Sequence, residues 1–150
     1  MKLSTEIKSY INRSVLCWLA TSSEQNIPNV SPKEIFNYYG TDKIIIANIA
    51  SPKTVRNVKQ NNSVCISFID ILVQKGYQIK GTAKIITRKD SHYSDMESTL
   101  VKMTHGKFPF SSITEITLET AKPIIAPKYI LYPETTEAEQ IENAKNMYRI

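Results

Sequence analysis

The chain has 150 residues and a formal net charge of +5, with lysines that are scattered and not gathered into a basic block with interleaved aromatics, which excludes a typical nucleic-acid-binding surface. A chain of this length fits one domain over residues 1–150 and buries roughly 70% of the surface that its unfolded form exposes. No apolar run approaches the ~20 residues that cross a bilayer, and the first residues lead into a charged, polar segment, so we expect a soluble, cytoplasmic protein without a membrane partner.

The chain begins with a predicted helix and β-hairpin. Ser4 or Thr5 caps a helix that ends before an apolar, β-rich segment. Residues 15–21 form the first strand, and residues 28–36 return antiparallel to it as the second.

One face of the second strand is polar. Its two prolines cannot donate to a sheet ladder, which places the strand at a sheet edge or around a bulge. The pleat puts Asn29, Ser31 and Lys33 on one face and Val30 on the other. The polar face is either the wall of a ligand site or a solvated outer surface, and this stretch alone favours neither.

The stretch from Lys43 to Val58 organises the rest of the chain. Its apolar run from Ile44 to Ala50 predicts a strand that is buried on both faces. A short helix with two inward-facing valines follows at once, because Ser51 is a good N-cap and Pro52 is shaped for the first helical position.

The start of this helix is a candidate anion site. The N–H groups of Lys53 and Thr54 have no acceptor within the helix, and the Ser51 hydroxyl and the Lys53 ammonium lie close to them. Such a helix end binds a phosphate or another anion. The alternative is an ordinary capped helix with a solvated lysine. With only four glycines, the chain builds neither a Rossmann fingerprint nor a P-loop.

The later strands predict a closing barrel. Residues 63–70 and 76–87 form two strands, and Gly81 within the second marks a bulge or a barrel corner. Residues 113–132 supply the last strand or strands, interrupted by two prolines. The fold class is therefore mainly β with peripheral helices (α+β), an antiparallel split β-barrel of six or so strands.

Two further helices are predicted in the second half of the chain. One, over residues 90–103, carries an apolar stripe that ends at Met103. The other begins at a capping box of Thr136 and Glu139 and has an apolar stripe that ends at Tyr148.

The cysteines and histidines form no metal or disulfide pattern. Cys17 and Cys65 lie in apolar, strand-like segments without CxxC spacing, and His92 and His105 are isolated. We therefore expect buried free thiols, surface histidines and no metal site.

The order of these motifs resembles the pyridoxamine 5'-phosphate oxidase-like family of FMN-binding split barrels. The similar parts are the hairpin VLCWLATSSEQNIPNVSPKEIF, the strand–helix–strand unit KIIIANIASPKTVRNVKQNNSVCISF and the long strand GYQIKGTAKI, which together cover about residues 15–86. The resemblance implies a homodimer with FMN at the subunit interface. An open-edged barrel favours the same assembly, because a two-fold contact buries a face that the barrel itself leaves uncovered.

The resemblance also implies which residues contact FMN, with some contacts coming from the second subunit. They are Ser51, Lys53 and Thr54 at the phosphate, Val30, Ser31 and Lys33 along the ring edge and ribityl chain, Ala47 and Asn48 on the third strand, and Tyr77 and Gln78 at the ring.

The C-terminal part departs from the family pattern. True pyridoxamine phosphate oxidases complete their substrate site with a Trp- and Arg-containing C-terminal segment, whereas the only tryptophan here is Trp18. The resemblance therefore implies an FMN-dependent oxidoreductase that acts on an unidentified small molecule and not on vitamin B6. A non-catalytic flavin-binding or electron-transfer module is the main alternative, since no acid/base residue lies near the presumed ring. A barrel that binds another anionic ligand or a macromolecule is the third.

Overall fold

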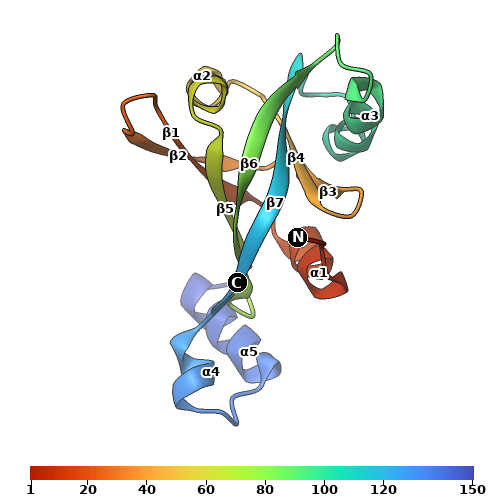
Figure 1. Cartoon of the computed structure of the whole chain (residues 1–150). Helices are drawn as coiled ribbons and strands as arrows, with labels where there is room; N and C mark the ends of the chain where they lie inside the picture. Colours follow the sequence, from red (N-terminus) through yellow and green to blue (C-terminus); the bar gives the residue numbers. More distant parts are fainter.

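Seven antiparallel strands curl into a split barrel in the computed structural model, which describes residues 1–150 (Figure 1). The strands are β1 (Cys17–Ser22), β2 (Pro28–Lys33), β3 (Phe36–Tyr39), β4 (Lys43–Ala47), β5 (Ser63–Asp70), β6 (Lys75–Thr87) and β7 (Ser112–Ile125), in the sheet order β2-β1-β5-β6-β7-β4-β3. The helices are α1 (Thr5–Arg13), α2 (Pro52–Gln60), α3 (Tyr93–Thr104), α4 (Pro127–Leu131) and α5 (Glu137–Tyr148). This confirms the predicted antiparallel split barrel with peripheral helices. No helix combines the length and the hydropathy that a membrane crossing needs.

The barrel is split between β2 and β3, which are the two edges of the sheet although they follow one another in the chain. The edge position of β2 confirms the prediction from its two prolines. The prediction of one strand over 28–36 was wrong, because the chain bends at residues 34–35 and crosses from one edge to the other. The Ile35 carbonyl accepts a hydrogen bond from the Ala47 N–H at 3.0 Å, which holds this crossing against β4.

Two apolar clusters make up the core, and β4 contributes to both. Ile44 and Ile46 face the larger cluster inside the barrel, which α1 covers. Ile45 and Ala47 face the smaller cluster beneath α3. The prediction of a strand buried on both faces is thus confirmed for Ile44 to Ala47. It was wrong for residues 48–50, because the strand ends at Ala47 and Ala50, with a φ of 48°, is exposed. Along α3 the predicted stripe is wrong at its end, because Met103 is exposed and the last turn buries a threonine instead.

The long strands β6 and β7 form the centre of the sheet. Their register shifts between Lys80 and Gly81, which confirms the predicted bulge. Only glycine fits there, since an added Cβ would collide with the Thr117 carbonyl oxygen. The predicted break at Pro123 is wrong. β4 pairs only with residues 113–117 of β7, so Pro123 lies where one side of β7 is free and a missing N–H costs no ladder bond.

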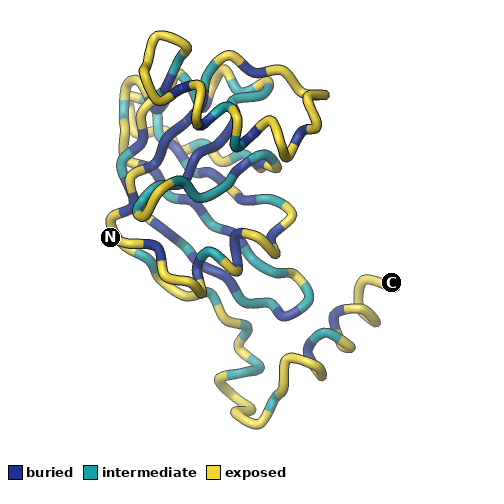
Figure 2. Tube along the Cα trace, turned by 90° about the vertical axis from the view of Figure 1, so that its right-hand side faces the viewer, coloured by how far each residue is buried: buried dark blue, intermediate teal, exposed yellow.

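Beyond β7 the chain leaves the barrel and forms the C-terminal arm, residues 126–150, which contains α4 and α5 (Figures 1 and 2). The predicted capping box is confirmed, since the Thr136 hydroxyl accepts from the Glu139 N–H and the Glu139 carboxylate accepts from the Thr136 N–H. Ala144 is buried, whereas Tyr148 is exposed at the end of the predicted stripe. The arm therefore contacts the barrel through part of α5 and through Tyr129 of α4.

Candidate functional site

The turn from β4 into α2 carries the groups of the predicted anion site. Ser51 is the N-cap residue, as predicted, but its hydroxyl does not cap the helix. It donates to the Ile49 carbonyl at 2.9 Å and accepts from the Lys33 ammonium at 2.6 Å. The first N–H groups of α2, those of Lys53 and Thr54, therefore have neither an intrahelical acceptor nor the cap side chain. The positive end of the helix is left open for an anion.

Lys33 is a buried cation without a carboxylate partner. Its exposure is 7%, and none of the four ion pairs in the structure involves it. Burial lowers the pKa of the Lys33 ammonium, an effect that the nearby Cys17 thiol partly opposes. Cys17 lies opposite Lys33 in the β1–β2 register, and its own burial raises the pKa of its thiol. A buried ammonium without a carboxylate partner is stabilised when an anion binds beside it.

Polar contacts join α2 to the strands beneath it. The Ser31 and Thr54 hydroxyls are 3.3 Å apart, and the Asn57 side-chain amide donates to the Thr21 hydroxyl at 3.0 Å. Thr54 and Asn57 are buried, whereas Val55, one of the two valines expected to face inward, is only half-buried. The face of α2 that packs on the barrel is thus more polar than its sequence indicated.

A hollow of about 410 Å³ opens beside the start of α2. It is lined by Asn48, Ser51, Pro52, Val55, Arg56, Lys59 and Ser112. The Asn48 side chain is fixed in place, since it donates to the Ser112 hydroxyl at 3.1 Å and accepts from the Thr114 hydroxyl at 2.8 Å. Arg56 and Lys59 add two cations that belong to no ion pair. The hollow therefore collects positive charge, hydrogen-bond donors and no carboxylate.

A second hollow, of about 230 Å³, lies on the other side of the same turn. Lys33, Ala47, Ile49 and Phe108 line it, together with the residues of the β2–β3 crossing. Phe108 extends from the loop after α3 and is exposed. Because Lys33 bonds to Ser51 in the first hollow and also lines the second, its ammonium connects the two spaces.

The structure brings together only part of the predicted set. It places Ser31, Lys33, Asn48, Ser51 and Thr54 around the turn, with Ala47 in the second hollow.

The other predicted residues point elsewhere within one chain. The Lys53 side chain is exposed and does not line either hollow, and Val30 faces away from its neighbours in β2. Tyr77 is buried on the barrel interior, where its hydroxyl donates to Glu6 at 2.6 Å and burial raises the pKa of its phenol to about 12. Gln78 lies on β6, which β1 and β5 separate from β2.

Arg56, Lys59 and Ser112 line the first hollow without having been predicted. A signal was present for the first two, because Pro52, Val55, Arg56 and Lys59 follow the spacing of one helix face. Ser112 carries no such signal, since only the pairing of β4 with β7 brings it to the turn.

The split barrel and the turn that carries its cations together define a protein of the pyridoxamine phosphate oxidase type. Residues 3–124 match the family model described as pyridoxamine 5'-phosphate oxidase, so the chain belongs to this family. The match ends within β7 and leaves the C-terminal arm outside it. A comparison with curated proteins returns no match.

Solved structures of the same fold include three from bacteria. HupZ of Group A Streptococcus is 25% identical, with a TM-score of 0.69 over 79% of this chain and 91% of that one. An FMN-binding protein from Syntrophomonas wolfei is 17% identical, with a TM-score of 0.68 over 80% and 84%. A protein from Clostridium acetobutylicum related to general stress protein 26 is 20% identical, with a TM-score of 0.61 over 80% and 86%.

Proposed function

We propose that this chain is an FMN-binding flavoprotein that acts as an FMN-dependent oxidoreductase on a small molecule. The proposal rests chiefly on Lys33, a buried ammonium without a carboxylate partner that bonds to the N-cap of α2. Natural proteins rarely keep an uncompensated buried charge unless a ligand neutralises it. The family supports the same ligand, and the Syntrophomonas wolfei protein of this fold is itself described as FMN-binding.

The residues around the turn fit the phosphate of FMN. The N–H groups of Lys53 and Thr54, the Ser51 hydroxyl and the cations Arg56 and Lys59 supply the donors and charge that a phosphate dianion needs. The hollow of about 410 Å³ lies within the 300–1,000 Å³ that is usual for small-molecule sites.

The second hollow fits the ring side of the cofactor. Ala47 and Ile49 offer an apolar wall, and Ser31 and Lys33 offer polar groups beside it. When bound, FMN supplies hydride or electron transfer at its ring. Lys33 holds positive charge next to this wall, and that charge favours an anionic form of whatever binds there.

The proposal includes a homodimer with the cofactor at the subunit interface and a cytoplasmic location. Both hollows are open on one chain, whereas a ligand of this size is usually buried by 70% or more of its surface. A second subunit would supply the missing wall, and it is from there that Tyr77 and Gln78 would have to approach, through a rearrangement in the case of Tyr77.

The absorbance spectrum of the purified protein tests the flavin directly. We expect the two visible bands of an oxidised flavin, or their appearance after addition of FMN in a fluorescence titration. A protein that neither carries nor binds FMN would overturn the proposal. Light scattering with FMN bound tests the assembly, and a monomer mass would refute the shared site.

One observation favours a non-catalytic flavin-binding or electron-transfer module as the second candidate. The second hollow, on the ring side, is lined by one carboxylate, that of the exposed Glu34, and by no Asp or His, and the first hollow is lined by none of the three. Oxidation of a reduced nicotinamide in the presence of a panel of acceptors separates the two functions. Steady turnover supports the oxidoreductase, and bound flavin without turnover supports the module.

A further inference from the structure

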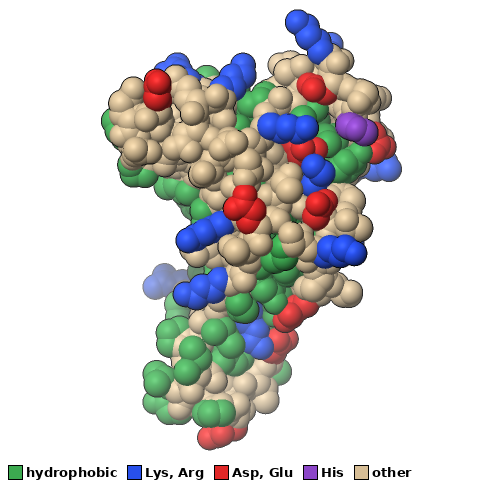
Figure 3. All heavy atoms as spheres, in the orientation of Figure 1, with side chains coloured by type: hydrophobic (Ala, Val, Ile, Leu, Met, Phe, Trp, Pro, Cys, Tyr) green, Lys and Arg blue, Asp and Glu red, His purple; other side chains and the backbone are tan.

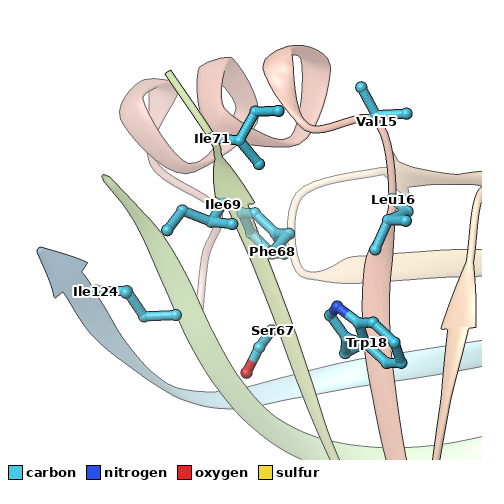
Figure 4. Close-up of a pocket in the computed structure, with 8 residues that line it drawn as sticks. All are labelled: Val15, Leu16, Trp18, Ser67, Phe68, Ile69, Ile71 and Ile124. Carbon is cyan, nitrogen blue, oxygen red and sulfur yellow. The ribbon is translucent and has the colours of Figure 1, made fainter. Parts of the chain in front are cut away.

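An apolar groove lies on the sheet over β1 and β5 (Figure 4). Its volume is about 420 Å³, and it is lined by Val15, Leu16, Trp18, Ser67, Phe68, Ile69, Ile71 and Ile124, with no charged side chain. Trp18 is 48% exposed and Val15 is 76% exposed, although both are large apolar residues. An open apolar surface on a folded domain is typical of a site for a protein partner, a membrane or an apolar ligand.

The C-terminal arm carries the other concentration of exposed apolar side chains. They are Ile130, Leu131, Tyr132, Met147, Tyr148 and Ile150. Figure 3 shows hydrophobic side chains gathered on the arm. Leu131 and Met147 are each 70% exposed. The arm lies outside the residues that match the family model, so this apolar surface is an addition to the shared barrel.

The arm of one chain lies beside the groove of the same chain but does not occupy it. A smaller hollow beside the groove shares Ile69, Ile71 and Ile124 with it and has Tyr148 of α5 on its far wall. The arm of the same chain therefore borders the groove.

The arm is held in this bordering position by its own contacts. Lys75 and Glu137 form an ion pair at 2.9 Å, and the Tyr129 hydroxyl donates to the Val73 carbonyl at 2.9 Å. Ile141 packs against the main core cluster. To enter the groove of its own chain, the arm would have to break these contacts, so the groove is left for another molecule.

We propose that a second copy of this chain fills the groove, and that each subunit lays its C-terminal arm into the groove of the other. In a two-fold contact the same two surfaces meet twice, so a chain that carries both closes into a dimer without leaving either exposed. The six arm residues keep 48–77% of their surface exposed, so the arm and the groove together offer an area comparable with the roughly 800 Å² per partner of a standard interface.

This arm exchange deepens the homodimer of the proposed function and is tested separately from it. One chain carries Ser67→Cys in the groove, and a second, coexpressed chain with a larger affinity tag carries Leu131→Cys or Met147→Cys in the arm. Both chains also carry Cys65→Ser, which removes the half-buried native thiol, while Cys17 is fully buried. A flexible bismaleimide is added, and denaturing gels resolve the mixed pair by size.

The expected result is a covalent heterodimer of the two tagged chains with at least one of the two arm cysteines. The matched control replaces Ser67→Cys by Ser98→Cys on the exposed side of α3, and no heterodimer is expected from it. When Ser67→Cys and an arm cysteine share one chain, cross-linking within monomers alone would overturn the exchange, as would the absence of any cross-link. Light scattering and the flavin spectrum of the same samples show whether the protein is still a dimer and still binds FMN when no cross-link between chains forms. The arm exchange and the proposed function are thereby tested separately.

Discussion

The two ends of the barrel differ in the side chains that lack a partner: one end has unpaired cations, and the other has exposed apolar side chains. Around the start of α2, cations gather without carboxylates, and one of them, Lys33, is buried. Around the C-terminal arm and the groove beside it, apolar side chains are exposed and no charge lines the groove. The first region and the groove lie within the residues that match the family, and only the arm lies outside them.

The difference indicates two different kinds of partner. A buried charge is neutralised by a small ion that enters the pocket, since a protein surface rarely reaches so deep. A broad apolar surface is covered by another apolar surface, because its stabilisation grows with the area removed from water. The cationic region therefore suits an anionic ligand, and the apolar region suits an apolar partner.

The largest expected effect concerns the phosphate itself. If the cationic end recognises the phosphate, riboflavin, which lacks it, should bind about 100-fold more weakly than FMN, because several charge-assisted hydrogen bonds are lost together. Fluorescence titrations of both flavins against the same protein measure the ratio. Equal affinities would show that the ring alone is recognised and would remove the basis of the comparison.

The substitution Lys33→Met should move affinity and stability in opposite directions. FMN binding should weaken by about 2–3 kcal/mol, because a charged partner is lost in a buried setting. The free energy of unfolding of the FMN-free protein should rise by about 1 kcal/mol, because the desolvation cost of the buried ammonium is removed. Isothermal titration and chemical denaturation measure the two changes. Lys59→Met, at an exposed lysine, is the control and should leave stability unchanged.

The stability gain from Lys33→Met should depend on pH. Burial lowers the pKa of Lys33 below its ordinary value of 10.5, so the folded protein binds this proton less tightly than the unfolded chain. The cost to the parent protein is complete at pH values below the folded-state pKa, and it disappears as the pH rises to 10.5 and beyond. The two unfolding free energies should therefore converge in alkaline buffer. A difference in unfolding free energy that stays constant with pH would show that folding does not lower the pKa of Lys33.

Local sequence signals predicted much of the fold. The apolar run of β4, the bulge at Gly81 and the capping box of Thr136 all depend on neighbouring residues, and the structure has each of them. No strand is predicted over residues 37–39, yet they belong to β3 and pair with β4. Such pairing depends on contacts that no local window contains.

The candidate site likewise has a part that local motifs predict and a part that depends on contacts between distant residues. Ser51 and Thr54 follow from the helix-start motif, but the bond between Lys33 and Ser51 joins residues 18 positions apart. The contact of Asn48 with Ser112 spans 64 positions and exists only because β4 pairs with β7. The apolar groove could not be predicted either, since the exposure of an apolar residue is decided by what the rest of the chain leaves uncovered.

A comparison of Arg56→Ala with Lys53→Ala sharpens the map of the cationic end. Arg56 lines the hollow, whereas the Lys53 side chain is exposed outside it and offers only its backbone N–H. Arg56→Ala should therefore weaken FMN about tenfold, and Lys53→Ala by less than about threefold, as is usual for an exposed, screened charge. The same titration serves for both. A larger loss from Lys53→Ala would restore that ammonium as the main phosphate ligand, as the sequence suggested.

The smallest effect is expected at the other end, from Lys75→Met. This change removes the ion pair with Glu137 and the contact of the ammonium with the Tyr129 ring, 4.3 Å from its centroid. Because both partners of the pair are partly exposed, the loss should be no more than about 1 kcal/mol. Amide hydrogen exchange should show faster exchange in α5, while the strands of the barrel keep their protection. If the strands lost protection in step with α5, the arm and the barrel would unfold as one unit. The arm would then be part of the barrel's own stability, and its exposed apolar side chains would no longer mark it as a separate element free to dock on a second copy.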